Sequence, residues 1–161
     1  MRTTLLLLWC LLLAACQPVN DPLDEAQITT EVLNVLGEYA DASENGDVER
    51  ALSFFIDDDR FVWAEDGTIR YSTFEELEAA IRSLPSFGGV QTEYSDQTVH
   101  VASSDHASIM AKFSSTIGDP SAGGFSFSGV STMNMIRTPE GWKIMSGHTS
   151  SYRPRPGYEA Q

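Results

Sequence analysis

The residue of this chain best suited to acid/base chemistry is His148, one of three histidines among 161 residues. It lies in GWKIMSGHTSSY, residues 141–152, where apolar and polar residues alternate as in a β-strand. By strict alternation His148 shares a face with Trp142 and Ile144, so we expect it to point into the same apolar interior. A histidine in an apolar pocket can serve as an acid, a base or a hydrogen-bond donor. The alternative is a polar residue bonded to backbone near a strand end.

Carboxylates that could work with this histidine are sparse. Between residues 90 and 152, Glu93 alternates outward, Asp96 falls at an expected irregularity of its strand, and the other acids lie in turn-like segments. Histidine and carboxylate side chains are the usual agents of proton transfer. Without a carboxylate on an inward strand position, the sequence leaves open whether the protein is an enzyme.

Metal-binding patterns are weak in this sequence. The three aspartates at 57–59 offer the oxygen ligands that Ca²⁺ and Mg²⁺ prefer, but no EF-hand spacing accompanies them and a solvated loop explains them. His100 and His106 have no neighbours at zinc spacing. His100 alternates away from the helices, toward solvent or a dimer interface, and His106 falls in a surface turn. We therefore predict no metal site and no cofactor.

The first half of the chain has the pattern of helices. Apolar residues recur at helical spacing over residues 24–45, and a shorter helix is expected to start after its cap Asp47. Ser72 and Glu75 form a capping-box pattern at the start of a third helix. Each of these helices has one apolar face that must pack against another element.

The remaining segments have the pattern of strands. Asp-Gly between apolar runs predicts a hairpin whose strands are 61–64 and 68–71, with residues 65–67 as its turn. The apolar phase changes within 90–102, which indicates a bulge near 95–97. Further strands are predicted at 107–113, 125–137 and 141–152. Helices that precede an antiparallel meander indicate the α+β class, with one curved sheet and the helices packed in its concave side.

The N-terminus has the pattern of a secretory signal. Residues 1–15 contain Arg2 and then a short apolar run, and the quartet Leu-Ala-Ala-Cys at 13–16 matches the lipobox of bacterial lipoproteins. The match implies cleavage before Cys16 and lipidation of its thiol and new amine, which anchors the protein to a membrane. Because Gln17 is not the aspartate that often retains lipoproteins at the inner membrane, we expect the outer membrane, facing the periplasm, in a Gram-negative source. Residues 16–24 then form a tether.

The exported part is strongly acidic. Loss of residues 1–15 would leave 9 basic against 23 acidic residues, a net charge of −14. Nucleic-acid binding needs clustered Lys and Arg, so we expect no nucleic-acid partner. With Cys10 removed and Cys16 lipidated, no cysteine remains for a disulfide. A single domain at 25–152, followed by a tail at 153–161, must be stable through its core alone.

The order of elements resembles the nuclear transport factor 2-like superfamily, and within it the SnoaL-like domains. The resemblance lies in NGDVERALSFFIDDDRFVWAEDGTI at 45–69 and GWKIMSGHTSS at 141–151, and it covers residues 25–152. It implies a cone of three N-terminal helices packed in a curved, mostly antiparallel sheet, the cystatin-like roll, with a pocket open at one end. Members often pack two copies sheet to sheet, so a homodimer is among the expected assemblies.

The functions of this superfamily range from isomerases, cyclases, dehydratases and hydrolases to binding and assembly modules, so the fold alone does not settle the activity. Tyr and Trp bring polar tips to an apolar wall, which suits a binding pocket. The leading hypothesis is that the domain binds a small, largely apolar molecule; the alternatives are an enzyme of one of these types with His148 as acid/base, and a non-catalytic envelope assembly module. The residues that we expect to line the pocket are Tyr39, Phe55, Trp63, Tyr71, Phe113, Trp142 and His148.

Overall fold

The computed structural model describes residues 24–83, 90–118 and 124–152. The predicted signal peptide, nearly all of the tether and the tail lie outside the described residues. The elements are, in chain order, α1 (Glu25–Glu44), α2 (Val48–Leu52), β1 (Val62–Glu65), β2 (Thr68–Tyr71), α3 (Phe74–Ser83), β3 (Val90–Val101), β4 (His106–Ile117), β5 (Phe125–Thr138) and β6 (Gly141–Ser151).

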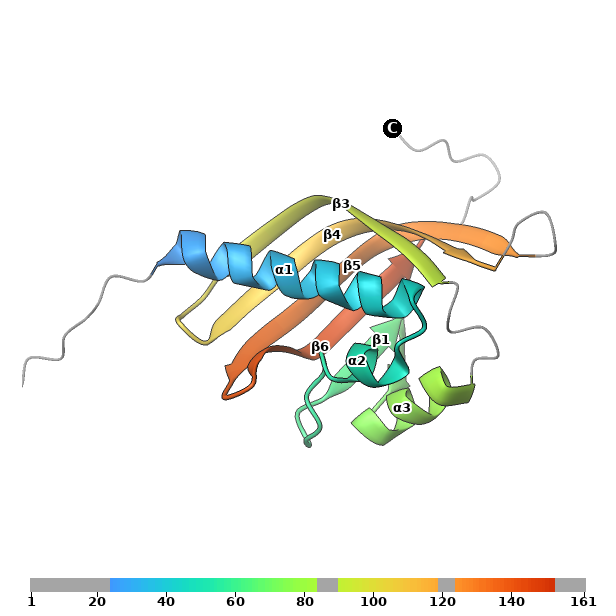
Figure 1. Cartoon of the computed structure of the whole chain (residues 1–161), viewed down its shortest axis with the longest axis horizontal. Coiled ribbons are helices and arrows are strands. Elements are labelled where there is room, and N and C mark those ends of the chain that lie inside the picture. Colours follow the sequence, from blue (N-terminus) through green and yellow to red (C-terminus); the bar gives the residue numbers. More distant parts are fainter. Residues whose placement is uncertain (1–23, 84–89, 119–123, 153–161) are drawn as a thin grey trace, which may run out of the picture.

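The strands form one six-stranded sheet in the order β2-β1-β6-β5-β4-β3. All neighbouring pairs are antiparallel except β1 and β6, which run parallel. Helix α1 lies across one face of this sheet, and α2 and α3 lie near its β1–β2 end (Figure 1). The predicted α+β class, with N-terminal helices on a curved sheet, is confirmed.

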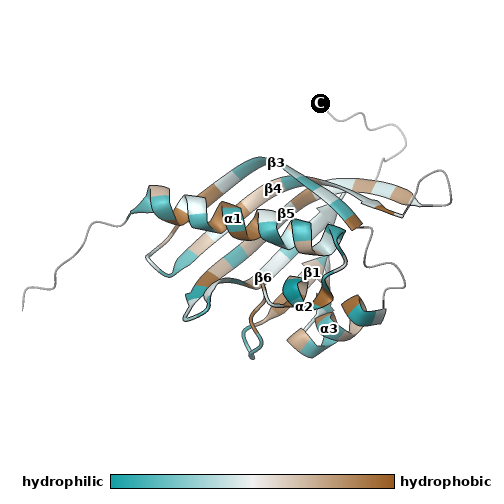
Figure 2. Ribbon diagram, viewed as in Figure 1, coloured by the Kyte–Doolittle hydropathy of each residue, from teal (hydrophilic) through white to brown (hydrophobic). Residues whose placement is uncertain are grey.

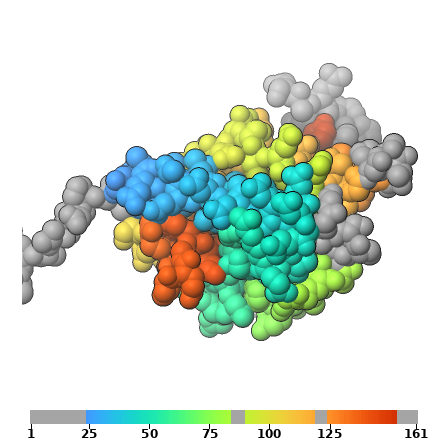
Figure 3. Space-filling view, viewed as in Figure 1, coloured from blue at the N-terminus to red at the C-terminus, as the bar shows by residue number. Residues whose placement is uncertain are grey.

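The core lies between α1 and the inner face of the sheet. The predicted inward residues of β4 are all buried, namely Ala107, Ile109, Ala111 and Phe113. Apolar and polar residues alternate along the long strands, as a sheet with one covered face requires (Figure 2). In the space-filling view α1 and the segment that follows it cover much of this face (Figure 3).

Capping residues fix the starts of the first two helices, and of these the cap Asp47 was predicted. The side chain of Asp24 accepts a hydrogen bond from the backbone of Gln27, and that of Asp47 accepts one from the backbone of Arg50. Gly46 joins the two helices with a φ of 69°, a conformation that glycine adopts without strain. Because both caps satisfy otherwise unpaired N–H groups, the helix boundaries follow directly from the sequence.

The start of α3 differs by one residue from the prediction. Thr73 rather than Ser72 is the capping residue, since its hydroxyl accepts from the backbone N–H of Glu76. The carboxylate of Glu76 in turn accepts from the backbone N–H of Ser72 at 2.7 Å. The predicted box of Ser72 and Glu75 is therefore wrong, because the hydroxyl bond joins Thr73 to Glu76 and the carboxylate bond joins Glu76 to Ser72.

The hairpin has a tighter turn than predicted. Only Asp66 and Gly67 form it, with φ values of 48° and 87°, as in the two-residue turns that match the twist of paired strands. Glu65 was predicted in the turn, but it is the last residue of β1 and pairs with Thr68. As a strand residue, Glu65 has a side chain with a defined direction relative to the sheet, which a turn residue does not have.

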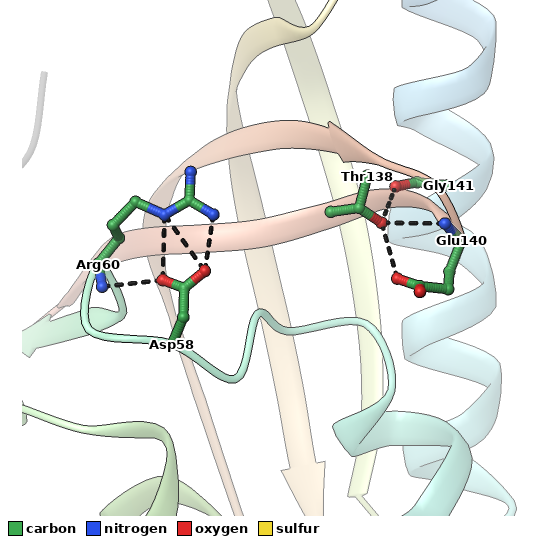
Figure 4. A network of polar contacts seen from close by, with 5 residues as sticks. All are labelled: Asp58, Arg60, Thr138, Glu140 and Gly141. Carbon is green, nitrogen blue, oxygen red and sulfur yellow. Dashed lines mark hydrogen bonds and ion pairs between the residues drawn. The ribbon is translucent and has the colours of Figure 1, made fainter.

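Polar contacts fix the loop before β1 and the turn between β5 and β6 (Figure 4). The carboxylate of Asp58 accepts from the backbone and the guanidinium of Arg60. The hydroxyl of Thr138 accepts from the backbone of Glu140 at 3.2 Å and contacts the carbonyl of Gly141 at 3.0 Å. At least one of the three aspartates at 57–59 is thus occupied in a local ion pair.

The pairing register shifts in three places, one of them between β1 and β2, where Trp63 pairs with Tyr71 and Ala64 pairs with Ile69. The bulge predicted in β3 is confirmed between Ser95 and Thr98. Another bulge lies in β6, where Asn134 pairs with Ser146 and Met135 pairs with Ile144. Met145 is thus an extra residue, and it reverses the alternation for the rest of the strand.

The bulge at Met145 corrects the predicted direction of His148. Before the bulge, Trp142 and Ile144 are buried, as predicted. After it, Gly147 faces the ring of Trp63 and Thr149 reaches the interior. His148 lies between these two residues and is exposed. The expectation that it points into the interior is therefore wrong.

Candidate functional site

A cavity of about 250 Å³ lies between α1, α3 and the inner face of the sheet. Its wall has three kinds of side chain, drawn from every strand. The aromatic ones are Tyr39, Phe55, Trp63, Tyr71, Tyr94, Phe113 and Phe127; the polar ones are Ser43, Glu65, Thr92, Ser115, Ser131 and Thr149; the aliphatic ones are Ala40, Leu77, Ile81, Val90 and Ile117. Large apolar surface with a few polar groups is the usual character of a ligand site.

Five of the seven residues predicted to line a pocket lie in this wall, namely Tyr39, Phe55, Trp63, Tyr71 and Phe113. They come from α1, from the segment before β1, and from β1, β2 and β4. The structure thus brings together side chains that are up to about 75 residues apart in sequence.

Trp142 was predicted in the wall but has a different place. It is buried, and its indole N–H donates to the carboxylate of Glu31 on α1 at 2.9 Å. The guanidinium of Arg137 lies over the same indole, 4.7 Å from its centre, and also binds Glu31. The hydrogen bond from Trp142 is the main cause that lowers the pKa of Glu31. Trp142 therefore fixes α1 to the sheet and does not face the cavity.

His148 is outside the wall as well. Its Nε2 lies 3.4 Å from the hydroxyl of Ser150, on the outer side of β6. His100 and His106 are also exposed, and His106 contacts Asp105. Within the described ranges no three His, Cys, Asp or Glu side chains come together in a way that could hold a metal ion.

Glu65, which was not among the predicted site residues, places a carboxylate in the cavity wall. It is two residues after Trp63 on β1, and both side chains line the cavity. Its strand pairs in parallel with β6, which places Glu65 opposite Thr149. The alternation of the strand from Trp63 predicts that Glu65 faces the same side. Because Glu65 was assigned to the turn, the alternation was not extended to it.

Phenol groups surround the polar part of the cavity. Burial raises the pKa of Tyr39, and the nearby Tyr71 and Glu65 raise it further, while the hydroxyl of Ser43 acts in the opposite direction. Burial also raises the pKa of Tyr94, with a smaller contribution from Tyr39. Both phenols therefore stay neutral at physiological pH and keep a proton to donate.

Two of these phenols are available to a ligand. Within the described part of the chain, the hydroxyls of Tyr71 and Tyr94 form no hydrogen bond. No described side-chain oxygen is both inaccessible and without a partner, so these two hydroxyls retain access to the cavity or solvent. By contrast, Thr92 and Ser115 bond to each other at 2.8 Å and need no ligand.

The apolar part of the wall is a set of rings at steep angles to one another. The rings of Tyr39 and Phe55 meet at 87° with centres 5.4 Å apart, and those of Phe55 and Trp63 meet at 76° with centres 6.2 Å apart. Edge-to-face pairs are the favoured arrangement of aromatic side chains. Since neighbouring rings are nearly perpendicular, their faces cannot all be covered by one another.

The family model for the SnoaL-like domain matches residues 32–154. The chain belongs to the SnoaL-like family. Its membership confirms the resemblance drawn from residues 45–69 and 141–151. Of the helices in the described part of this SnoaL-like protein, none combines the length and apolar character that a membrane crossing requires.

Solved structures with the same fold include an NTF2-like protein of unknown function from Shewanella oneidensis, 17% identical with a TM-score of 0.65, which covers 76% of this chain and 98% of its own. An NTF2-like protein with a cystatin-like fold from Novosphingobium aromaticivorans is 18% identical with a TM-score of 0.63, covering 78% and 82%. A ketosteroid isomerase-like protein from Erwinia carotovora is 18% identical with a TM-score of 0.60, covering 78% and 96%. A search of curated proteins found no significant match. These similarities establish the fold.

Proposed function

We propose that this protein is an exported, lipid-anchored SnoaL-like domain that binds a small, largely apolar molecule in its cavity. The observation that carries the proposal is the wall of that cavity, in which seven aromatic side chains surround one carboxylate and several hydroxyls. A purely structural core would be filled by its side chains, because protein interiors are close-packed. The export and the anchor rest on Cys16 and the residues before it.

The test is native mass spectrometry of the protein purified from its own host, with two matched variants of α1. Ala40 lines the cavity and Ala26 is exposed on the same helix. We expect the wild type and Ala26→Phe to carry a bound small molecule and Ala40→Phe to lack it, because the new ring occupies the cavity. An empty wild type, or an Ala40→Phe variant that retains the molecule, would refute the proposal.

An acid/base enzyme is the second candidate, and Glu65 favours it. A carboxylate that faces a cavity beside buried phenols can take a proton from a substrate while a phenol donates a hydrogen bond to the substrate's oxygen. In this version Glu65 replaces His148, whose exposed position gives it no contact with a molecule in the cavity. Glu65→Gln distinguishes the two candidates, because an enzyme loses its turnover while a simple binding protein still holds a neutral ligand.

A further inference from the structure

The charge of the cavity wall selects the kind of ligand that can enter. Among the described lining residues Glu65 is the only charged one, and none is Lys, Arg or His. An anionic ligand would bring its charge next to this carboxylate, and no lining residue carries a positive charge that would attract it, which is unfavourable. The wall therefore suits a neutral or a positively charged molecule.

The aromatic rings favour the positive charge over the neutral molecule. The face of an aromatic ring carries partial negative charge and attracts a cation, most strongly when the ring is Trp or Tyr. Trp63, Tyr39 and Tyr71 supply such rings within the same wall as Glu65. The rings of Tyr39 and Trp63 meet that of Phe55 at 87° and 76°, and all three line the cavity.

A positively charged side chain of the protein, Arg70, already contacts Tyr71 and Glu65. The guanidinium of Arg70 lies over the ring of Tyr71, 5.6 Å from its centre, and 3.9 Å from the carboxylate of Glu65. Arg70 is exposed and does not line the cavity. A contact of this length between exposed groups neutralises Glu65 only in part. The pair of Glu65 and Tyr71 is thus a place where a positive charge is stable.

The net negative charge of the protein also favours a cationic ligand. The chain has 10 basic and 23 acidic residues. The field of such a chain raises the local concentration of cations and lowers that of anions. The net charge, the carboxylate and the rings are independent features, and all three favour a cation.

We propose that the ligand is a small organic cation, an amine or quaternary ammonium group on an apolar body, held by Glu65 and the rings of Trp63, Tyr39 and Tyr71. This inference rests on the proposed binding function and names the class of ligand. The cavity, at about 250 Å³, is slightly smaller than most drug-sized ligand sites, which are about 300–1,000 Å³, so the ligand is small.

The test compares two probes of the same shape that differ only in charge. Choline and 3,3-dimethylbutan-1-ol have the same heavy-atom skeleton, with nitrogen in one and carbon in the other. Isothermal titration of the lipid-free mature chain measures the affinity for each. We expect choline to bind roughly 10- to 30-fold more tightly, the effect of a desolvated cation–π contact.

Two variants identify the source of this preference. Glu65→Gln removes the charge without changing the shape of the side chain, and Glu93→Gln makes the same change at an exposed position of β3. We expect Glu65→Gln to weaken choline binding about 10-fold and to leave the affinity for the alcohol unchanged. Glu93→Gln should leave the affinity for both probes unchanged. Trp63→Leu should also reduce the preference for choline.

The outcomes separate the two proposals. If the alcohol binds as tightly as choline, or if a neutral molecule co-purifies with the protein, the cation assignment is wrong while the cavity still binds a ligand. If choline fails to bind at millimolar concentration, the cation assignment is also wrong. If neither probe binds and the wild type carries nothing from its host, the binding function fails as well.

Discussion

Replacing Gly147 by alanine should destabilise the protein, because the added methyl group has no room. A Cβ atom at this position would lie 2.2 Å from Cζ3 and 2.7 Å from Cε3 of Trp63. Carbon atoms in contact are about 3.5–4.0 Å apart, so the indole must move by about 1 Å or more. Overpacking of this kind lowers the free energy of unfolding by about 1–3 kcal/mol.

The displaced ring should also change the site. Trp63 lines the cavity and makes an edge-to-face contact with Phe55 at 6.2 Å. A methyl group behind the indole pushes it toward the cavity, which reduces the space for a ligand. We therefore expect Gly147→Ala to weaken ligand binding as well as stability.

The matched control is Gly37→Ala on α1. A Cβ atom there meets no heavy atom within 4 Å, and the residue is exposed in the middle of the helix. Alanine is better than glycine at such a position by about 0.5–1 kcal/mol. The same chemical change should thus stabilise the protein at Gly37 and destabilise it at Gly147.

Urea unfolding followed by circular dichroism measures both effects without relying on the fluorescence of Trp63. A Gly147→Ala variant as stable as the wild type would refute the reasoning, because it would mean that residue 147 faces outward. Strict alternation along β6 would then hold, and His148 would point inward. The experiment therefore tests the bulge at Met145 directly.

Three further predictions concern other parts of the molecule. Glu31→Gln should lower the free energy of unfolding by about 1–2 kcal/mol at pH 7, because Trp142 and Arg137 both donate to that carboxylate. Since the folded pKa of Glu31 is lowered, this difference should persist above about pH 4.5 and shrink in denaturation curves as pH falls through the folded pKa. Gly129→Ala should cost more than Gly147→Ala in the same unfolding assay, because its Cβ would meet β6 backbone at 2.0 Å, where no side chain can move aside. Cys16→Ser should release the protein from the membrane fraction of its host, as seen on immunoblots.

Local signals in the sequence were sufficient to predict the helices and the hairpin, though not the exact cap of α3 or the length of the hairpin turn. Asp24 and Asp47 act as caps because a carboxylate pairs with N–H groups that the helix leaves free, and this chemistry needs no tertiary contact. Asp66 and Gly67 form their turn for an equally local reason, the need for two positive φ values. Such features depend on only a few neighbouring residues.

The bulges in β3 and β6 differ in whether the sequence of the strand itself predicts them. In β3 the bulge was predictable, because apolar residues on both sides of it, such as Tyr94 and Val99, mark the change of phase. In β6 the residues after Met145 are Ser, Gly, His, Thr and Ser, and none of them marks a face. The direction of His148 is set by how β6 pairs with β5, so the strand's own sequence could not reveal it.

The charged end of the cavity depends on long-range pairing in the same way. Glu65 faces the interior because the tight turn keeps it in β1 and because β1 pairs in parallel with β6, at the opposite end of the chain. Tyr39, whose pKa Glu65 helps to raise, lies on α1. The side chain of Glu65 is 42% exposed and lies 3.9 Å from the exposed guanidinium of Arg70, a contact that contributes little to stability. A carboxylate on the cavity wall whose partner in the described chain is so weak can still accept a partner from outside, which is the role proposed above for an organic cation.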